Sequence, residues 1–189
     1  VLAYGMFSQI FSRTTTAIVG NSGLIKQVAI PREVFLWSIG GFQVLRFFLS
    51  SLIIPPLLLI MGMDLNPTIL LIPFIPIGIL SLSMGIGMIT SVLHTHVRDT
   101  SHVVSILIAA GFFLSGVFFG MRHIDPQYHD IFALNPMAVY IEMLRALATG
   151  NFDILRPEYI IQTVLFSILI LLIGCIVFVR HEAQAVKNL

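Results

Sequence analysis

The chain has 189 residues, of which 57% are hydrophobic and only 10% are charged. A soluble domain carries roughly 25% charged residues, so lipid must be the solvent for most of this chain, and we expect an all-α polytopic membrane protein. The net charge of +1 gives no reason to expect a nucleic-acid partner.

Five stretches have the length and composition of membrane-spanning helices, which need about 20 mainly apolar residues. They are 1–19, Val34–Met61, Thr68–Leu93, Val103–Met121 and Tyr159–Val179. The first is the weakest, because serine, threonine, glutamine and arginine side chains dilute it. The chain begins inside an apolar run, so we interpret 1–189 as one membrane domain that lacks an N-terminal segment.

A polar segment, residues 21–33, separates the first two apolar stretches. Asn21 and Ser22 suit the start of a short helix, and Pro31 suits a break before the next span. Glu33 is favourable in the first turn of that span, because a helix N-terminus attracts negative charge. We expect a helix on the membrane surface here.

The basic residues indicate the orientation of the chain, because cytoplasmic connections carry more Lys and Arg. If connections alternate between sides, one side carries Arg13, Lys26, Arg32, Arg98, Arg180 and Lys187 against Glu33, Asp99 and Glu182. The other side carries Arg122, Arg145 and Arg156 against Asp64, Asp125, Asp130, Glu142, Asp153 and Glu158. We therefore expect the first side, which includes the C-terminus, to be cytoplasmic.

The outward loop before the last stretch contains a further amphipathic helix. Asn135 suits its N-cap, Pro136 its first position and Gly150 the residue just past its end. Glu142 and Arg145 lie three residues apart and can pair. A helix of about 14 residues is only about 21 Å long, so we expect it either to lie in the outer interface or to enter the membrane and return.

Arg46 lies deep in the second stretch, where an arginine costs several kcal/mol unless it faces water or a partner. No Asp, Glu or Lys lies at a comparable depth. One interpretation is that Arg46 faces a polar path or an anionic cargo. The alternatives are a shifted helix that brings it to an interface, or an ion pair across a subunit contact.

Aromatic side chains are candidates for lining the same path, among them Phe42, Phe112 and Phe113. The alternative is that they face lipid or a neighbouring helix. Small residues form two pairs at a spacing of four, Ser81 with Gly85 and Ser83 with Gly87. Such pairs allow helices to pack closely.

Other chemistry is not indicated by the sequence. It contains no phosphate-binding G-x-x-x-x-G-K-[ST] loop, so we expect no nucleotide site of its own. No Ser/His/Asp or paired-carboxylate set falls where water and a substrate could both reach it, and we expect no enzyme. The histidines near residue 96 have no carboxylate or cysteine companion that would favour a metal site, so we expect none.

Four motifs occur in chain order. They are Asn21…Leu24-Ile25-Lys26…Pro31-Arg32-Glu33, then Arg98-Asp99, then Phe113–Phe119, then Asn135-Pro136…Glu142…Arg145. Together they resemble the ABC-2 type permeases that export bacterial surface polysaccharides such as O-antigen, teichoic acid and capsule. Ile30 replaces the usual phenylalanine before Pro31, and Gly116 stands where many O-antigen members have proline.

The resemblance implies a homodimeric pore in the bacterial inner membrane, with six spans of which this chain holds the last five. It implies a lipid-linked or polymeric glycan as cargo. A separate cytoplasmic ATPase would bind ATP and Mg²⁺, and this chain would bind no cofactor. The segments corresponding to 21–33 and 122–150 would dock the ATPase and gate the exit, respectively.

We therefore identify three sets of candidate residues. The coupling residues are Asn21, Leu24, Ile25, Lys26, Pro31, Arg32, Glu33, Arg98 and Asp99. The candidate path residues are Arg46, Phe42, Phe112 and Phe113, and the candidate outer-gate residues are Asn135, Pro136, Tyr140, Glu142 and Arg145.

Two alternatives stay open. A protein of the same fold could export a drug, an antibiotic or a lipid. A membrane enzyme or scaffold is the other alternative, but an enzyme would need acidic or histidine residues clustered at one membrane face, and here the outer acidic residues are scattered along a loop.

Overall fold

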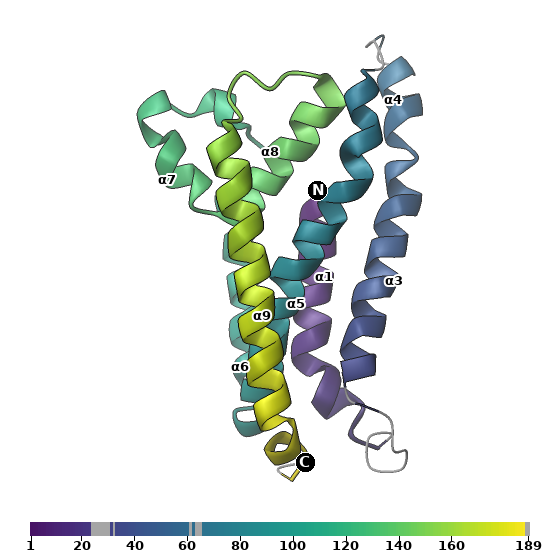
Figure 1. Cartoon of the computed structure of the whole chain (residues 1–189), viewed down its shortest axis with the longest axis vertical. Coiled ribbons are helices and arrows are strands. Elements are labelled where there is room, and N and C mark those ends of the chain that lie inside the picture. Colours follow the sequence, from purple (N-terminus) through teal and green to yellow (C-terminus); the bar gives the residue numbers. More distant parts are fainter. Residues whose placement is uncertain (24–30, 32, 61, 63–65, 188–189) are drawn as a thin grey trace.

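The computed structural model describes residues 1–23, 31, 33–60, 62 and 66–187, without the side chains of 182–187. Every regular element in these ranges is a helix, which confirms the all-α prediction (Figure 1). The elements are α1 (Leu2–Gly20), α3 (Glu33–Ser51), α4 (Ile54–Ile60), η1 (Pro67–Phe74), α5 (Ile75–His96), α6 (Thr100–Leu114), η2 (Met121–His123), η3 (Pro126–Tyr128), α7 (His129–Ala133), α8 (Pro136–Thr149) and α9 (Pro157–Lys187).

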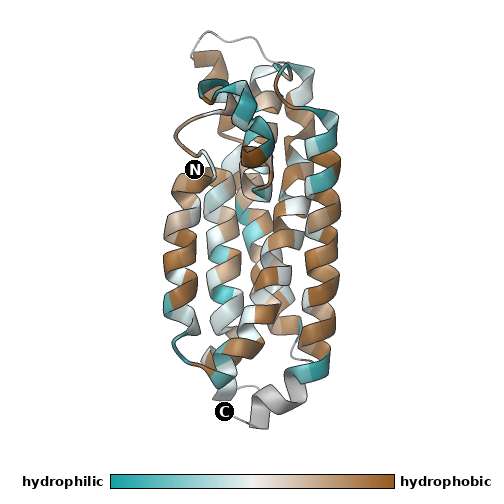
Figure 2. Cartoon of the chain, turned by 90° about the vertical axis from the view of Figure 1, so that its left-hand side faces the viewer, coloured by the Kyte–Doolittle hydropathy of each residue, from teal (hydrophilic) through white to brown (hydrophobic). Residues whose placement is uncertain are grey.

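The long helices run alternately up and down the bundle. The C-terminal ends of α1, α5 and α9 and the N-terminal ends of α3 and α6 lie together at the lower end in Figure 1. The helices α4, α7 and α8 lie at the upper end. Hydrophobic residues cover most of the length of the helices, and many of the hydrophilic positions lie toward the two ends (Figure 2).

Among the described residues, three helical segments are long and apolar enough to cross a membrane. They are Glu33–Ile60, Pro67–His96 and Pro157–His181. They correspond to the second, third and fifth predicted stretches. The number can rise to four if Pro126–Ala133 (η3 and α7) and α8, which are bent by 114° at their break, form one broken span. The chain is thus a multi-pass membrane protein, and the count of five spans stays a prediction.

The fourth predicted stretch, Val103–Met121, has the wrong boundaries. The helix begins at Thr100 and ends at Leu114, so α6 has 15 residues and is about 22 Å long, which is shorter than a roughly 30 Å hydrocarbon core. Gly116 follows with a φ of +63°, a left-handed conformation that ends helices and that proline cannot adopt. The apolar run 115–119 therefore forms a turn, and the helix does not continue through it.

Helix α5 is the centre of the bundle and packs between α1 and α9 (Figure 1). Close packing depends on the predicted small residues. A Cβ atom on Gly85 would lie 2.5 Å from the carbonyl oxygen of Ile170 in α9, and one on Gly87 would lie 2.8 Å from the Cβ of Thr14 in α1. The predicted role of these glycines in helix packing is confirmed.

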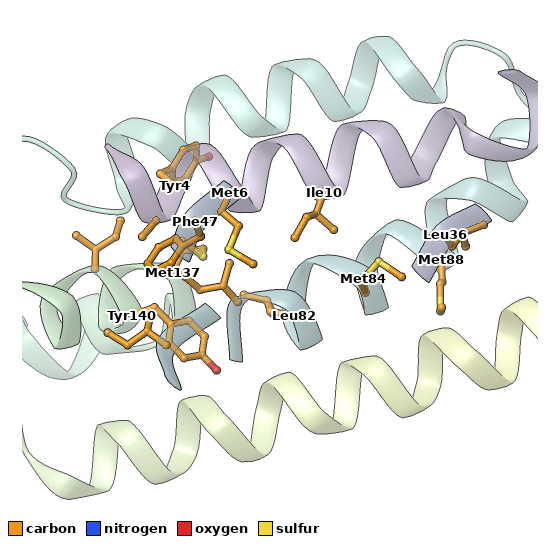
Figure 3. Close-up of a cluster of buried hydrophobic side chains, with 14 of the residues drawn as sticks. Tyr4, Met6, Ile10, Leu36, Phe47, Leu82, Met84, Met88, Met137 and Tyr140 are labelled. Atoms are coloured by element: carbon orange, nitrogen blue, oxygen red, sulfur yellow. The ribbon is translucent and has the colours of Figure 1, made fainter. Parts of the chain in front are cut away.

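The hydrophobic core joins α1, α3, α5 and α8, together with Ile72 of η1 and Phe178 of α9. It includes Tyr4, Met6 and Ile10 of α1, Leu36 and Phe47 of α3, Leu82, Met84 and Met88 of α5, and Met137 and Tyr140 of α8 (Figure 3). Helix α8 is thus anchored in the same core as the long helices. The apolar residues of α8 recur at helical spacing, so one face of this helix is buried.

Candidate functional site

The predicted coupling segment begins at the lower end of the bundle. Asn21 ends α1, and its side-chain amide donates a hydrogen bond to the carbonyl of Ala17 at 2.8 Å. Residues 22–23 are helical again, and α3 begins at Glu33, in the first turn as predicted. Pro31 is exposed. Four candidates lie outside the described residues: Leu24, Ile25, Lys26 and Arg32.

Arg98 and Asp99 occupy the short turn between α5 and α6. Both side chains are exposed, and Asp99 precedes the first residue of α6. The end of α5 and the start of α6 lie at the lower end of the bundle, as do the end of α1 and the start of α3 (Figure 1). The structure therefore brings this turn and the edges of the segment 21–33 to one end of the molecule.

A polar cavity of about 440 Å³ lies between α1 and α3. Gln43, Arg46 and Ser50 line it from α3, where their spacing of three and four places them on one face. Gln9 lines it from α1. Gln43 is 2% exposed, and its Nε2 atom has no hydrogen-bond partner among the described residues. This Nε2 atom is inaccessible from the cavity, so the polar groups that an occupant can reach are those of Gln9, Arg46 and Ser50.

The structure places Arg46 beside other polar groups and at mid-length of a spanning helix. Its side chain is exposed and lines the cavity, together with the two glutamines. Phe42 lies on the same helix, but it is exposed and contributes to neither this cavity nor the aromatic cavity described next. The structure thus separates Phe42 from the two predicted phenylalanines of α6.

Those two phenylalanines, Phe112 and Phe113, line a second cavity of about 330 Å³ between α1 and α6. The ring of Phe112 packs edge-on against the rings of Tyr4 and Phe118, with centroids 5.3 and 5.2 Å away. The Tyr4 hydroxyl donates a hydrogen bond to the carbonyl of Ile108 and so fixes α1 against α6. Aromatic rings of this kind offer flat apolar faces with a nearby polar group.

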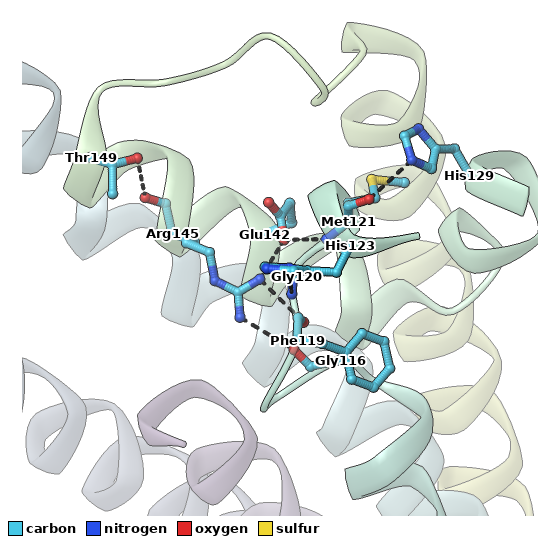
Figure 4. A network of polar contacts seen from close by, with 9 residues as sticks. All are labelled: Gly116, Phe119, Gly120, Met121, His123, His129, Glu142, Arg145 and Thr149. Atoms are coloured by element: carbon cyan, nitrogen blue, oxygen red, sulfur yellow. Dashed lines mark hydrogen bonds and ion pairs between the residues drawn. The ribbon is translucent and has the colours of Figure 1, made fainter. Parts of the chain in front are cut away.

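A polar network holds the upper end together (Figure 4). Glu142 of α8 is 7% exposed, and it accepts hydrogen bonds from Arg145 at 2.6 Å and from the backbone N–H of Met121 at 3.3 Å. Arg145 also donates to the carbonyls of Gly116 at 3.2 Å and Phe119 at 3.4 Å. The predicted Glu142–Arg145 pair is confirmed, and it fastens the turn after α6 to α8.

The start of α8 is fixed as predicted. The Asn135 side chain accepts a hydrogen bond from the N–H of Met137 at 3.0 Å, Pro136 is the first helical residue, and Gly150 ends the helix in a left-handed conformation. The amide of Asn135 also donates to the carbonyl of Leu114 at 3.3 Å. This bond satisfies a carbonyl at the end of α6 that has no partner within its helix.

Tyr140 links α8 to the spanning helices. It is 1% exposed, and its hydroxyl shares a 2.8 Å hydrogen bond with Ser167 of α9. On the other side its ring lies directly against Gly78 of α5, where any side chain would collide with it. Tyr140 therefore fits between two spanning helices and holds the middle of α8 against both.

Sequence reasoning missed Gln9, Gln43 and Tyr4. Gln43, Arg46 and Ser50 share one helical face, so this stripe can be recognised in the sequence once Arg46 has been identified. Gln9 and Tyr4 carry no such signal, because only the packing of α1 against α3 and α6 brings them to the cavities.

Comparison with known proteins identifies the family. The family model described as ABC-2 type transporter matches residues 1–148. Two proteins of Klebsiella pneumoniae, each described as an O-antigen export system permease protein RfbA, are 26% and 25% identical over 91% of this chain. A protein of Myxococcus xanthus with the same description is 26% identical over 78% of this chain. The chain spans 66% of the length of the first two proteins and 57% of the third. This chain belongs to the ABC-2 type transporter family.

Proposed function

We propose that this chain is the membrane-spanning permease of an exporter that moves a lipid-linked or polymeric surface glycan across the bacterial inner membrane. The observation that carries this proposal is the family match over residues 1–148, together with relatives described as O-antigen export permeases. The polar cavity and the aromatic cavity beside α1 support it, because a glycan path needs both hydrogen-bonding groups and flat apolar faces.

A separate cytoplasmic ATPase subunit, carrying ATP and Mg²⁺, supplies the energy in this proposal, and two copies of the permease form the pore. The ATPase docks at the lower end, on the segment 21–33 and the turn with Arg98 and Asp99. This location is supported by the exposure of Pro31, Arg98 and Asp99. It is also supported by the position of the end of α1, the start of α3 and the α5–α6 turn at one end of the bundle. The basic excess on this side supports a cytoplasmic location for it and for the C-terminus.

The coupling role is tested with Glu33→Ala and Arg98→Ala in the full-length permease. We expect both variants to reach the membrane in normal amounts and to lose export, because the conformational change of the ATPase is no longer transmitted to the spanning helices. The readouts are surface glycan and ATPase activity in purified complexes. Glu158→Ala, at the other end of the bundle, is the control and keeps export. Normal export by both lower-end variants would exclude this end as the docking site.

Cargo passes along the α1 surface in this proposal, beside Arg46 and the two glutamines and past Phe112 and Phe113. Arg46 is the charged side chain in the wall of the polar cavity between α1 and α3. A phosphate or acidic sugar on the cargo would offset the free-energy cost of placing its charge in the membrane. The outer helix α8, with Glu142 and Arg145, closes the exit until the cargo arrives.

Arg46→Leu tests this path. We expect export to fall by about tenfold, the factor that corresponds to 1.4 kcal/mol of lost interaction with the cargo. Arg46→Lys, which keeps the charge, is the matched control and retains most of the export. Surface glycan is measured per permease molecule in the membrane. Wild-type export by Arg46→Leu would remove Arg46 from the path.

The glycan proposal itself is tested by deletion. Loss of surface glycan in a deletion strain, restored by the intact gene, supports a glycan cargo. Recovery of an ATPase subunit with the tagged full-length permease supports the two-subunit arrangement. Unchanged surface glycan together with a new sensitivity to drugs would favour a drug exporter of the same family.

A further inference from the structure

A third cavity, of about 480 Å³, lies on the side of α5 that faces α8 and α9. Its walls include Phe74 and Ser81 from η1 and α5, Tyr140 and Met143 from α8, and Val164 and Ser167 from α9. None of its lining residues lines the polar cavity or the aromatic cavity beside α1. Its volume lies in the range of sites that bind small molecules, about 300–1,000 Å³.

The polar side chains in its wall offer little to water. The hydroxyl of Ser81 donates to the carbonyl of Ile77 at 2.9 Å, and that of Ser167 donates to the carbonyl of Thr163 at 2.8 Å. The Tyr140 hydroxyl is bonded to Ser167. A buried water needs two to four polar partners. The three hydroxyl protons are already used in these bonds, so the hydroxyls can offer a water only acceptor lone pairs. The rest of the wall is mostly apolar, so the cavity favours hydrocarbon over water.

The cavity opens onto the apolar surface of two membrane-crossing segments. Phe74, Ile77 and Ile168 line it and are also exposed on the outside of the bundle. They belong to Pro67–His96 and Pro157–His181, which are both long and apolar enough to cross a membrane. Lipid chains surround these helices, and an empty apolar cavity forfeits the dispersion contacts that such a chain would make.

We propose that this cavity holds one acyl chain of a phospholipid from the surrounding bilayer. The chain enters between η1–α5 and α9 and packs against the buried face of α8, at Tyr140, Met143 and Leu147. It thereby becomes part of the wall that supports α8. Binding of the acyl chain does not depend on the proposed orientation of the protein in the membrane or on transport.

Photo-crosslinking tests this inference directly. The full-length permease is placed in nanodiscs of phosphatidylethanolamine and phosphatidylglycerol that contain a phosphatidylethanolamine with a diazirine in one acyl chain. Adducts are mapped by mass spectrometry after illumination. We expect adducts on Tyr140 and Leu147, which are buried and out of reach for a lipid that only coats the surface. Adducts confined to outward residues such as Leu165 and Leu169 would overturn the proposal.

Filling the cavity provides the second measurement. Val164→Trp and Ile168→Trp place an indole in the space, so we expect several-fold fewer adducts on Tyr140 and Leu147. Leu165→Trp, on the same helix but outside the cavity wall, is the matched control and leaves them unchanged. Equal adduct yields in all three variants would overturn the proposal, and the wild-type map stands even if a variant does not fold.

A lipid-linked cargo is a competing occupant, and the same nanodiscs distinguish it. Addition of unlabelled polyisoprenyl phosphate in amounts equal to the labelled phospholipid should leave the adducts on Tyr140 and Leu147 in place. Their loss would show that the cavity prefers an isoprenoid chain and would overturn the phospholipid assignment. A variant that loses export without a change in adducts gives information about the proposed transport function only, and the proposal of a lipid site is unaffected.

Discussion

Glu142 is a carboxylate buried at 7% exposure in a chain that has few charges, and its burial is offset by specific partners. Arg145 supplies a charge-assisted bond at 2.6 Å, and the N–H of Met121 supplies a second bond. A charged group in such surroundings is retained only where its partners are in place. Glu142 therefore fixes the short turn before η2 relative to α8.

Glu142→Ala should destabilise the protein. The substitution leaves the Met121 N–H without its acceptor and Arg145 without its counter-ion, and one unsatisfied buried group costs about 1–3 kcal/mol. Arg145 is partly exposed, so its own contribution is small. The measurement is the thermal unfolding temperature of the purified permease. Glu158→Ala, an exposed carboxylate, is the control, and an equal unfolding temperature for both variants would contradict this account.

Helix α5 shows why small residues matter in a bundle of membrane helices. Without a hydrophobic driving force between helices in lipid, association depends on close packing. Gly85 of α5 and Gly174 of α9 let the two backbones approach, because a Cβ on either would collide with the backbone of the other helix. The pairing of Gly85 with its partner on α9 required the structure, since the spacing in one helix does not name the opposite helix.

Gly85→Ala and Gly41→Ala should have opposite effects on stability. In a helix interior, alanine is normally favoured over glycine by roughly 0.5–1 kcal/mol. Gly41 has open space around its missing Cβ, so its substitution should be neutral or stabilising. At Gly85 the new methyl collides with α9, and overpacking costs about 1–3 kcal/mol. Unfolding temperatures in one detergent decide this; equal shifts in both variants would refute the close contact between α5 and α9.

Because α1, α3, α5, α6 and α9 alternate in direction, the end of α1, the start of α3 and the turn with Arg98 and Asp99 lie at one end of the molecule, and α8 lies at the other (Figure 1). The proposed division of the molecule into an ATPase-docking end and an exit end rests on this alternation. It requires that α1, α3, α5, α6 and α9 each cross the membrane. This includes α1 and α6, which are not among the segments that are long and apolar enough to be spans by themselves.

Single-cysteine labelling tests this topology. In a Cys175→Ser background, Asp153→Cys and His102→Cys each place a thiol at an exposed site on opposite ends of the bundle. A membrane-impermeant maleimide added to spheroplasts should label the first variant, because the proposed orientation puts the upper end outside. It should label the second only after the membrane is opened. Labelling of both variants in intact spheroplasts would contradict the proposed orientation.

The features that could be predicted from the sequence are those with local causes. Composition indicated the membrane, and capping chemistry at Asn135 and Gly150 defined α8, because a cap acts within a few residues. The Glu142–Arg145 pair followed from helical spacing. The end of α6 was misplaced, because an apolar run carries no signal for a turn that Gly116 and the Asn135 contact impose.

Which helices share a cavity could not be predicted from the sequence, because it depends on how the helices pack. Gln9 joins Gln43 and Arg46, and Tyr140 meets Ser167, because helices far apart in the chain pack side by side. The same packing placed Phe42 away from Phe112 and created the apolar cavity behind α8. Periodicity specifies the buried face of a helix but not its neighbour, since apolar faces in lipid are nearly interchangeable and close contact selects among them.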